Sequence, residues 1–466
     1  MDASPEQQET HALSHNTRDF KDPKGPNLLA RVDDFYRWQQ ARTALGYWPY
    51  SRALESAPQN TAAIRDSRGL PQQGVNFASQ DYLSLATDGE VKEAAVAAIR
   101  DYGVHSAGSA AVLGNTNLSL SLERALGELL QTEHVTLYPT GWAAGFGVCR
   151  GLVRPDDYIL IDALGHTCLQ EGALASTRKI SAFRHLDNAH VRTLLARIRK
   201  HDAVNGIMVV TESLFSMDSD TPQLSDLQDI CHEYGATLML DVAHDLGAMG
   251  PGGASAISIQ HMLGKVDVVM GSFSKTFASN GGFVATRSAG IKQFLKIFSP
   301  SQTFSNALSP AQAATVLAAT KIVRSPRGDT LRAQLMNNIR ALRGHLNTHG
   351  LNVMGIASPI VPVLITAEGG EQQVEAHARR AAKLLSEQGV LANLAEFPAV
   401  PQGLPRFRMQ VMAKHTEADT AKASGLYVSG TGERFERPAQ VEHRHLFIGS
   451  HSLQIVDQPA SGQRHR

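Results

Sequence analysis

The sequence predicts an α/β protein with a mostly parallel sheet that helices cover on both faces, followed by a smaller C-terminal α/β unit. Strand and helix patterns alternate between residues 157 and 273. The strand patterns are short runs of consecutive apolar residues, as expected for parallel strands buried on both faces. A mainly helical stretch begins near residue 287, and a second set of strand and helix patterns follows it.

The elements follow from these patterns in chain order. Apolar residues at three- and four-residue spacing predict helices, and apolar runs predict strands. In the first part of the chain we expect a helix at 27–46, a strand at 157–164, a helix at 189–201, a strand at 206–213, a helix at 224–235, and strands at 237–244 and 266–273. In the second part we expect a strand at 360–367, a helix at 373–389, a strand at 406–413 and a helix capped by Thr416.

The domain organisation is predicted from shifts in composition. The first 27 residues are polar and contain prolines, so we expect them to be disordered or loosely attached. The remaining chain divides into an N-terminal helix and arm (28–75), a large domain (76–300), a small C-terminal domain (301–423) and an unassigned tail (424–466).

Composition excludes several classes of protein. Lys and Arg together number 44, as do Asp and Glu, so no global charge favours nucleic acid or an acidic membrane. The three cysteines are scattered, which argues against a disulfide framework or a zinc site and suits a reducing compartment. The N-terminus lacks the apolar core of a signal peptide, and the longest apolar window is interrupted by polar residues. We therefore expect a cytoplasmic protein with no transmembrane segment and no metal site.

Polar residues follow the predicted strands, where parallel α/β sheets bind ligands. Asp241 and His244 follow one strand, and His166 follows another. Glu212 and Ser213 end a third strand. Each of these alone would more often be structural, and Asp241 alone is typical of a cap or turn residue. Their recurrence at several strand ends indicates a shared site.

Lys275 lies between an apolar run and a glycine pair, in the segment GSFSKTFASNGG. Thr140, Gly141 and Trp142 stand at a predicted helix start, where free N–H groups can hold a phosphate. These features fit pyridoxal phosphate, which needs a lysine for its Schiff base and an aspartate that keeps its ring nitrogen protonated. Burial of Lys275 would lower the pKa of its amine. Asp241 precedes Lys275 by about thirty residues, which suits neighbouring strands.

The ordered motifs resemble those of the α-oxoamine synthases, from about residue 40 to residue 423. The motifs are NFASQDYLSLA, YPTGWAAGFG, DALGHTCLQEG, FRHLDNAH, TESLFSMDSD, LDVAHDLGAMG, GSFSKTFASNGGFVA, FSNALSP, ASPIVPV and RFRMQVMAKHT. The family comprises fold-type I pyridoxal-phosphate enzymes such as serine palmitoyltransferase, 8-amino-7-oxononanoate synthase and 2-amino-3-ketobutyrate CoA ligase. The resemblance therefore implies a fold-type I transferase with pyridoxal phosphate as its cofactor.

The resemblance also implies roles for individual residues. Lys275 would form the Schiff base and move protons, and Asp241 would pair with the ring nitrogen. His244, with Ser213 nearby, would contact the phenolic oxygen, and His166 would stack over the ring. The full set of cofactor-binding candidates is Thr140, Gly141, Trp142, His166, Glu212, Ser213, Asp241, His244, Ser272, Ser274, Lys275, Ser305 and Asn306.

Substrate contacts and assembly are implied in the same way. Arg408 matches the arginine that binds the amino-acid carboxylate, for which a planar guanidinium is suited. The alternative for Arg408 is a surface charge at a strand edge. Gln80 stands where the family has an asparagine that orients the same carboxylate. In the family the site lies at a homodimer interface, and Ser305 and Asn306 match the residues contributed by the neighbouring subunit.

Besides Gln80, and Asn306 in place of the usual threonine, four further positions depart from the family pattern. The carboxylate of the usual DEAHS motif is lost at Val242, and another appears at Asp245. Ser119 replaces a common histidine, and Ala110 replaces a common arginine. None of these four belongs to the implied cofactor set, but each could change the amino acid, the acyl donor or its carrier.

The resemblance implies a decarboxylating condensation of an α-amino acid with an acyl thioester, carried on CoA or an acyl carrier protein, in lipid or secondary-metabolite biosynthesis. The segment ALGYWPYSRALES favours the serine palmitoyltransferase-like branch. Another fold-type I activity, an aminotransferase or carbon–carbon lyase, is the first alternative. A catalytically inactive partner subunit is the second, although such a subunit would be expected to lack Lys275.

Overall fold

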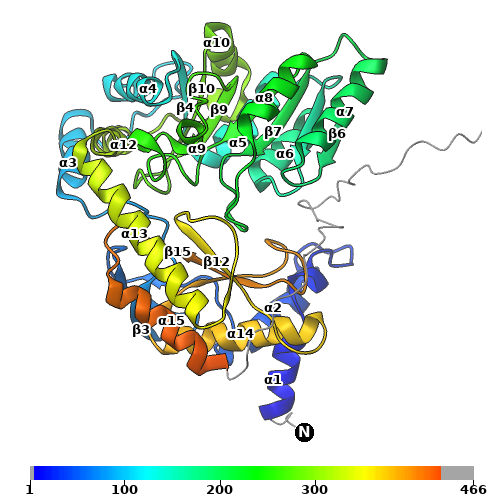
Figure 1. The fold of residues 1–466 in the computed structure, drawn as a ribbon, viewed down its shortest axis with the longest axis vertical. Coiled ribbons are helices and arrows are strands. Elements are labelled where there is room, and N and C mark those ends of the chain that lie inside the picture. Colours follow the sequence, from blue (N-terminus) through cyan, green and yellow to red (C-terminus); the bar gives the residue numbers. More distant parts are fainter. Residues whose placement is uncertain (1–4, 432–466) are drawn as a thin grey trace, which may run out of the picture.

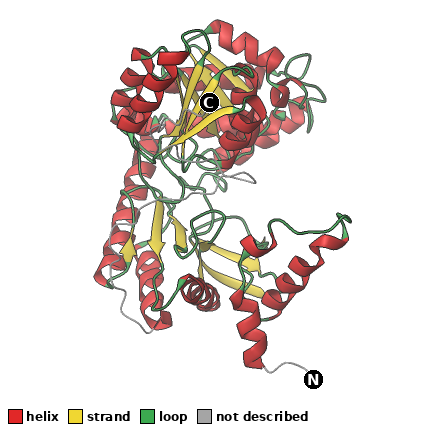
Figure 2. Ribbon diagram, turned by 90° about the vertical axis from the view of Figure 1, so that its right-hand side faces the viewer, coloured by secondary structure: helices red, strands yellow, loops and turns green. Residues whose placement is uncertain are grey.

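The computed structural model describes residues 5–431 and places them in two lobes (Figure 1). The larger lobe contains a seven-stranded sheet surrounded by helices, and the smaller lobe contains two four-stranded sheets with helices on their outer side (Figure 2). The long helix α13 (Pro326–Thr348) runs from the larger lobe along the smaller one. The predicted α/β class, with a smaller C-terminal unit, is confirmed.

The seven-stranded sheet is parallel except for β10, which runs antiparallel to both of its neighbours. Its strand order differs from the chain order, so the connections cross over the sheet as helices. Across the sheet the strands are β4 (His134–Tyr138), β10 (Gly282–Thr286), β9 (Val268–Ser272), β8 (Thr237–Asp241), β7 (Ile207–Glu212), β5 (Tyr158–Asp162) and β6 (Lys179–Phe183). The predicted strands at 157–164, 206–213, 237–244 and 266–273 are β5, β7, β8 and β9.

Alternate residues of each central strand enter two different cores. In β5, Ile159 and Ile161 pack on one face with α5 (Gly141–Leu152) and α6 (Thr167–Ser176), while Leu160 packs on the other face with α7 (Asn188–His201) and α8 (Leu224–Glu233). Both faces are therefore apolar, which explains why these strands appear in the sequence as continuous apolar runs. The surrounding helices are α3 (Gly89–Tyr102), α4 (Asn117–Leu130), α5 (Gly141–Leu152), α6 (Thr167–Ser176), α7 (Asn188–His201), α8 (Leu224–Glu233), α9 (Ser255–Ile259), α10 (Ala289–Phe298), α11 (Pro300–Thr303) and α12 (Pro310–Val323).

The smaller lobe combines the two ends of the chain. One sheet has the order β1-β2-β3-β13, and β13 from the C-terminal part runs parallel to β3 from the N-terminal part. The other sheet has the order β11-β12-β15-β14 and is antiparallel. The strands are β1 (Ala53–Leu54), β2 (Thr61–Arg65), β3 (Pro71–Asn76), β11 (Asn352–Val353), β12 (Ile360–Leu364), β13 (Val390–Leu391), β14 (Asn393–Ala395) and β15 (Arg406–Gln410); the helices beside them are α14 (Glu371–Glu387) and α15 (Glu417–Thr431).

The N-terminal segment differs from its expected disorder or loose attachment. Residues Pro5–Ser14 form helix α1, whose Ala12 and Leu13 are buried. The Arg379 guanidinium of α14 donates to the Leu13 carbonyl at 2.8 Å, and the Asn16 amide donates to Glu375 at 3.2 Å. Polar composition favoured disorder, but these contacts with α14 fix the segment. The helix expected at 27–46 is shorter, α2 (Asp33–Ala44), and residues 432–466 of the unassigned tail lie outside the described residues.

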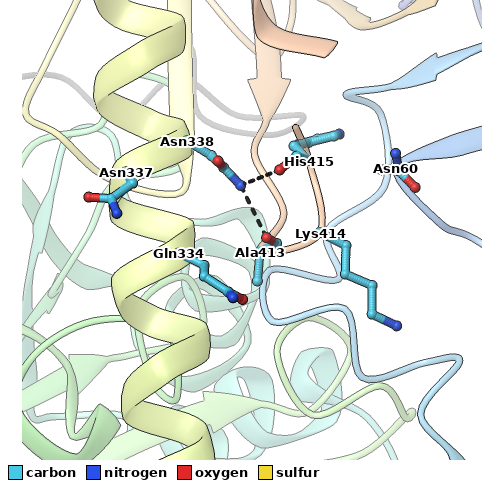
Figure 3. A pocket seen from close by; sticks show the side chains of 7 residues that line it. All are labelled: Asn60, Gln334, Asn337, Asn338, Ala413, Lys414 and His415. Atoms are coloured by element: carbon cyan, nitrogen blue, oxygen red, sulfur yellow. Dashed lines mark hydrogen bonds between the residues drawn. The ribbon is translucent and has the colours of Figure 1, made fainter. Parts of the chain in front are cut away.

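Helix α13 holds the segment that follows β15. The Asn338 side-chain amide lies 3.1, 3.1 and 2.7 Å from the carbonyl oxygens of Met412, Ala413 and His415. Figure 3 shows this anchor at one wall of a polar pocket of about 520 Å³. The pocket is lined by Asn60, Gln334, Asn337, Asn338, Ala413, Lys414 and His415, and it contains none of the site residues predicted from the sequence. The anchor fixes the C-terminal end of the strand that carries Arg408. Between residues 5 and 431, no helix is both long and apolar enough to cross a membrane.

His185 joins two acidic residues at the edge of the central sheet. Its ring nitrogens lie 2.8 Å from Asp162 and 3.1 Å from Asp220, and the ring packs edge-on against Phe215. Burial lowers the pKa of His185, but its hydrogen bonds to the two carboxylates outweigh burial and raise it to about 10. The protonated form is therefore the one that stabilises the fold.

The His185 ion pairs predict a pH dependence of stability. Their contribution is fully present below the unfolded pKa of 6.5 and is lost as the pH rises through the folded pKa of about 10. We expect His185→Gln to lose about 3 kcal/mol of unfolding free energy near pH 6.5 and much less near pH 10. Urea unfolding at several pH values measures this difference, with exposed His201→Gln as the control. A difference that stays constant with pH would contradict the assignment of charge to His185.

Candidate active site

Three parallel strands deliver the predicted residues to one edge of the central sheet. Glu212 at the end of β7 pairs in register with Asp241 at the end of β8. Asp241 in turn pairs with Met270 of β9, five residues before Lys275. The expectation that Asp241 and Lys275 follow neighbouring strands is therefore confirmed. His166 follows β5, the next strand across the sheet.

The N-terminus of α5 forms a cradle beside the end of β9. Thr140 caps the helix by accepting from the Ala143 N–H at 3.0 Å. The Gly141 and Trp142 N–H groups donate to no protein group in the described part of the chain. A Cβ on Gly141 would lie 2.4 Å from the Ser272 Cβ, so only glycine allows this approach. The cradle thus presents free N–H groups next to a serine hydroxyl.

Two serine hydroxyls and a second glycine complete this cradle. The Ser272 and Ser274 hydroxyl oxygens lie 2.8 Å apart. Gly282, which opens β10, lies so close to α5 that a Cβ there would be 2.7 Å from the Gly141 Cα. Free N–H groups, hydroxyls and the positive end of a helix are the features that bind a phosphate group. The donor set therefore fits the phosphate of the cofactor implied by the sequence.

Lys275 is half-buried beyond the end of β9. Burial lowers the pKa of its amine, and the positive charge of Arg408 lowers it further, while Asp241 and Glu212 oppose the shift. No hydrogen-bond partner of Nζ is present among residues 5–431. A lysine of lowered pKa without a fixed partner is suited to nucleophilic attack on an aldehyde.

Two buried carboxylates lie behind Lys275. Burial raises the pKa of Asp241 to about 6, and Lys275 opposes this shift. One Asp241 oxygen accepts from the Ala243 N–H at 2.8 Å, which leaves the other able to face a ligand. Burial also raises the pKa of Glu212, and the negative charge of Asp241 adds to that shift. Glu212 accepts from the His166 N–H at 2.6 Å, so it positions the backbone of the loop that carries His166.

His166 begins helix α6 and faces the cradle. Its Nδ1 lies 3.2 Å from the Cys168 N–H and caps the helix. The His166 ring and the Trp142 ring meet edge to face, with centroids 6.2 Å apart. Enclosure by the surrounding protein lowers the pKa of His166, and the positive charges of Lys275 and Arg408 add to that effect. A neutral, partly exposed ring at this position can stack on a planar ligand.

His244 is buried in the turn after β8, and Ser213, just after β7, contacts Asp245, the residue that follows His244. Burial lowers the pKa of His244 well below its usual value, and Lys275 and Arg408 lower it further. The Ser213 hydroxyl donates to Asp245 at 2.6 Å. Asp245 also accepts from the Ala256 N–H at 2.7 Å, and burial raises its pKa to about 7. The carboxylate gained at Asp245 therefore engages the Ser213 hydroxyl that was expected near the phenolic oxygen.

Two arginines of β15 differ in their partners. Arg406 is buried and forms an ion pair with Asp218. Arg408 has no acidic partner in the described structure, and burial lowers the pKa of its guanidinium. The positive charge of Arg408 contributes to the lowered pKa values of Lys275, His166 and His244, as expected for a guanidinium near them. Strand β15 lies between β12 and β14, so Arg408 is not on an edge strand. Its contact with an anionic ligand stays a prediction.

Three predicted residues are less closely tied to the cradle. Gln80 is half-buried in the loop after β3, and its side chain has no hydrogen-bond partner in the described structure. Ser305 and Asn306 lie on the loop before α12, where Asn306 forms an isolated bridge with Ser109. Their proposed approach to a neighbouring subunit stays a prediction.

Gly141→Ala tests the cradle. The new methyl group would push α5 away from Ser272, so the free N–H groups would no longer converge. We expect the affinity for pyridoxal phosphate to fall about tenfold or more, since hydrogen bonds to charged groups contribute about 1.5–3 kcal/mol each. Spectroscopic titration of cofactor-free protein measures the affinity. Gly89→Ala, at the first residue of α3 with open space for a Cβ, is the matched control. Equal affinities in both variants would remove the cradle from phosphate binding.

The sequence did not indicate roles for Tyr82 or Gln410. Both lie within largely apolar motifs, but the Tyr82 hydroxyl meets His244 and Gln410 only through the tertiary fold. A polar residue inside an apolar strand, such as Gln410 in RFRMQVMA, is the only sequence signal that could have drawn attention to this group.

Comparisons with known proteins identify the family of this chain. The aminotransferase class I and II family model matches residues 72–424. An 8-amino-7-oxononanoate synthase from Geobacter metallireducens is 33% identical over 368 residues, covering 79% of this chain and 90% of the relative. A serine palmitoyltransferase from Sphingobacterium spiritivorum is 33% identical over 389 residues, covering 84% of this chain and 93% of the relative.

A solved structure shares the fold over nearly its full length. The serine palmitoyltransferase of Sphingomonas wittichii superposes with a TM-score of 0.79 at 26% identity, covering 87% of this chain and 98% of that chain. The residues matched by the family model include the strands that carry the site. The chain therefore belongs to the α-oxoamine synthases of the aminotransferase class I and II family, which are pyridoxal-phosphate-dependent acyltransferases.

Proposed function

We propose that the protein condenses an α-amino acid with an acyl thioester, carried on CoA or an acyl carrier protein, and releases the thiol and carbon dioxide to form an α-oxoamine. The Arg408 guanidinium, which has no acidic partner among residues 5–431, is the observation that carries this proposal, because it offers a bidentate partner to the amino-acid carboxylate. Arg406, two residues earlier, is already neutralised by Asp218 and cannot take that role.

The residues of the cradle would hold the cofactor by its phosphate. The Gly141 and Trp142 N–H groups and the hydroxyls of Thr140, Ser272 and Ser274 are the donors available for this contact. When bound, pyridoxal phosphate supplies an aldehyde that condenses with amines and a ring that withdraws electrons from the amino-acid α-carbon. Asp241 would accept a hydrogen bond from the ring nitrogen and keep that nitrogen protonated.

The remaining side chains would position the reactants and move protons. Lys275 would supply the amine that attaches the cofactor, and after substrate exchange its Nζ would take the proton from the α-carbon. His166 would cover the ring, and its neutral state avoids repulsion with Lys275. Arg408 and Gln80 would orient the substrate carboxylate at the mouth of the site.

Assembly as a homodimer is part of the proposal. The loop that carries Asn306 lies against the segment around Gly108, through a hydrogen bond from the Ala307 N–H at 2.9 Å. Three large apolar residues of these segments, Val112, Leu113 and Phe304, are 85–87% exposed. An exposed apolar group of this kind favours a protein interface. Light scattering of the purified protein should give twice the mass of one chain.

An absorbance screen tests the proposed substrates. The cofactor band of the purified protein is followed while each of the twenty amino acids is added, with and without acyl-CoA thioesters of increasing chain length. We expect one amino acid to shift the band, and a thioester to change it again with release of thiol. The same amino acid should bind much more weakly to Arg408→Gln. A spectrum typical of half-transamination, without any response to thioester, would instead support the aminotransferase alternative.

A further inference from the structure

A chain of buried hydrogen bonds leads from β15 to His244. The Tyr82 hydroxyl lies 3.0 Å from Nδ1 of His244 and 3.2 Å from Oε1 of Gln410. Tyr82 and Gln410 are fully buried, and His244 is 6% exposed. Nδ1 is thereby engaged, and Nε2 of His244 has no partner among the described residues. Nε2 is therefore the ring atom left free for a ligand.

The hydroxyl proton of Tyr82 can serve only one of its two neighbours. If it goes to Gln410 Oε1, neutral His244 must carry its own proton on Nδ1 to complete the second contact. Nε2 of Gln410 is then a buried N–H donor without any acceptor in the described structure. Orphaned buried donors of this kind are rare in folded proteins because they lose their bonds to water.

Turning the Gln410 amide by half a turn removes this orphaned donor. The oxygen and nitrogen of an amide have nearly the same shape, so their positions are set by the hydrogen-bond network. The Gln410 amide nitrogen then donates to the Tyr82 oxygen, and the Tyr82 proton goes to Nδ1 of His244. The proton of neutral His244 then resides on Nε2. The amide oxygen is left without a donor, which folded proteins tolerate more readily than an orphaned N–H.

A doubly protonated His244 is disfavoured by its surroundings. Burial lowers the pKa of His244 well below its usual value, and the positive charges of Lys275 and Arg408 lower it further. The ring is therefore neutral, and only the choice between its two tautomers remains.

We propose that Gln410 and Tyr82 are positioning residues that hold neutral His244 in the tautomer with its proton on Nε2. His244 then presents a hydrogen-bond donor toward the phenolic oxygen of pyridoxal phosphate, a contact that rests on the proposed function. The other tautomer would present a lone pair there and would repel an ionised oxygen. The hydrogen bonds from Gln410 through Tyr82 to His244, here called the Tyr82 relay, thus join strand β15, which carries Arg408, to the cofactor site in the larger lobe.

Nitrogen-15 NMR of histidine-labelled holoenzyme, without amino acid or thioester, tests the tautomer directly. The His244 signals are identified by their loss in His244→Gln. We expect a protonated Nε2 and an unprotonated Nδ1 in the wild-type protein. A protonated Nδ1 there would overturn the proposal. Because the measurement involves no reaction, a failed condensation assay with the expected tautomer would count against the proposed function alone.

Gln410→Glu should reverse the relay. A carboxylate only accepts hydrogen bonds, and Arg408, which points to the same side of β15, favours its ionised form. Tyr82 would then donate to the new carboxylate, so Nδ1 of His244 would take the proton, and the affinity for pyridoxal phosphate should fall about tenfold. In Tyr82→Phe no hydroxyl contacts Nδ1 of His244, so we expect a mixture of both His244 tautomers. The loss of affinity for pyridoxal phosphate should be smaller than in Gln410→Glu.

Tyr138→Phe is the matched control for the loss of a buried hydroxyl. Its hydroxyl bonds to Ser299 at 3.1 Å, on the other face of the sheet, and neither the His244 tautomer nor the cofactor affinity should change. If Gln410→Glu does not fold, the wild-type and Tyr82→Phe spectra still show whether Tyr82 determines the tautomer of His244. A His244 tautomer that is the same in wild type, Tyr82→Phe and Gln410→Glu would show that another group sets it, and would overturn the proposal.

Discussion

Lys275→Ala is expected to lower turnover by at least about 10³-fold, since it removes both the attachment of the cofactor and the base for proton transfer. Lys275 lies beyond the end of β9 with two carboxylates nearby, and burial lowers the pKa of its amine. Alanine would leave the cradle of α5 intact, so pyridoxal phosphate should still bind, but without a covalent bond. Reduction with borohydride followed by mass spectrometry distinguishes covalent from non-covalent cofactor.

The matched control for this variant is Lys265→Ala. Lys265 is exposed and precedes the same strand, so its removal should change neither turnover nor the cofactor bond. A Lys275→Ala protein with undiminished turnover, or with cofactor still fixed by borohydride on another lysine, would exclude the proposed role of Lys275. A small added amine that restores part of the activity would show that proton transfer is the missing function.

Asp241→Asn is expected to lower turnover by about 10²- to 10³-fold, while the protein retains cofactor. The asparagine keeps the shape of the side chain and the contact with the Ala243 N–H, but it cannot stabilise a protonated ring nitrogen. Burial of the ionised Asp241 carboxylate is unfavourable, as its raised pKa indicates, and the neutral asparagine avoids this unfavourable free energy. Steady-state rates with saturating cofactor measure the loss.

A cofactor analogue tests whether Asp241 acts by keeping the ring nitrogen positively charged. Pyridoxal phosphate methylated on its ring nitrogen carries a fixed positive charge and needs no carboxylate to hold a proton. We expect this analogue to narrow the difference in turnover between the Asp241→Asn variant and the wild-type protein. An unchanged rate in that variant with the natural cofactor would remove Asp241 from its proposed role.

The sequence predicted the four adjacent strands β9, β8, β7 and β5 because each of them is largely buried on both faces. Continuous apolar runs such as the one in β7 leave little choice of secondary structure, and the polar residues that end them mark the binding edge. The rule that ligands bind at the carboxyl ends of parallel strands was enough to group Glu212, Asp241 and Lys275 from the sequence alone.

The features that the sequence missed depend on contacts between distant segments. Helix α1 is polar, and the residues that hold it, Tyr47, Arg379 and Arg380, come from distant parts of the chain. The pairing of β3 with β13 joins residues more than 300 positions apart, which no local pattern can indicate. The Tyr82 relay and the hydrogen bond from Ser213 to Asp245 were also missed. Both join residues that are far apart in the sequence and depend on the orientation of their side chains.

The most direct test of the account is a balance of the products of one reaction. The holoenzyme is incubated with the amino acid found in the absorbance screen, labelled with carbon-13 in its carboxyl group, and with its acyl thioester. Free thiol and labelled carbon dioxide are then measured together. We expect both to appear in equal amounts and only when both substrates are present. Transfer of the amino group to a keto acid, with neither thiol nor carbon dioxide released, would contradict it.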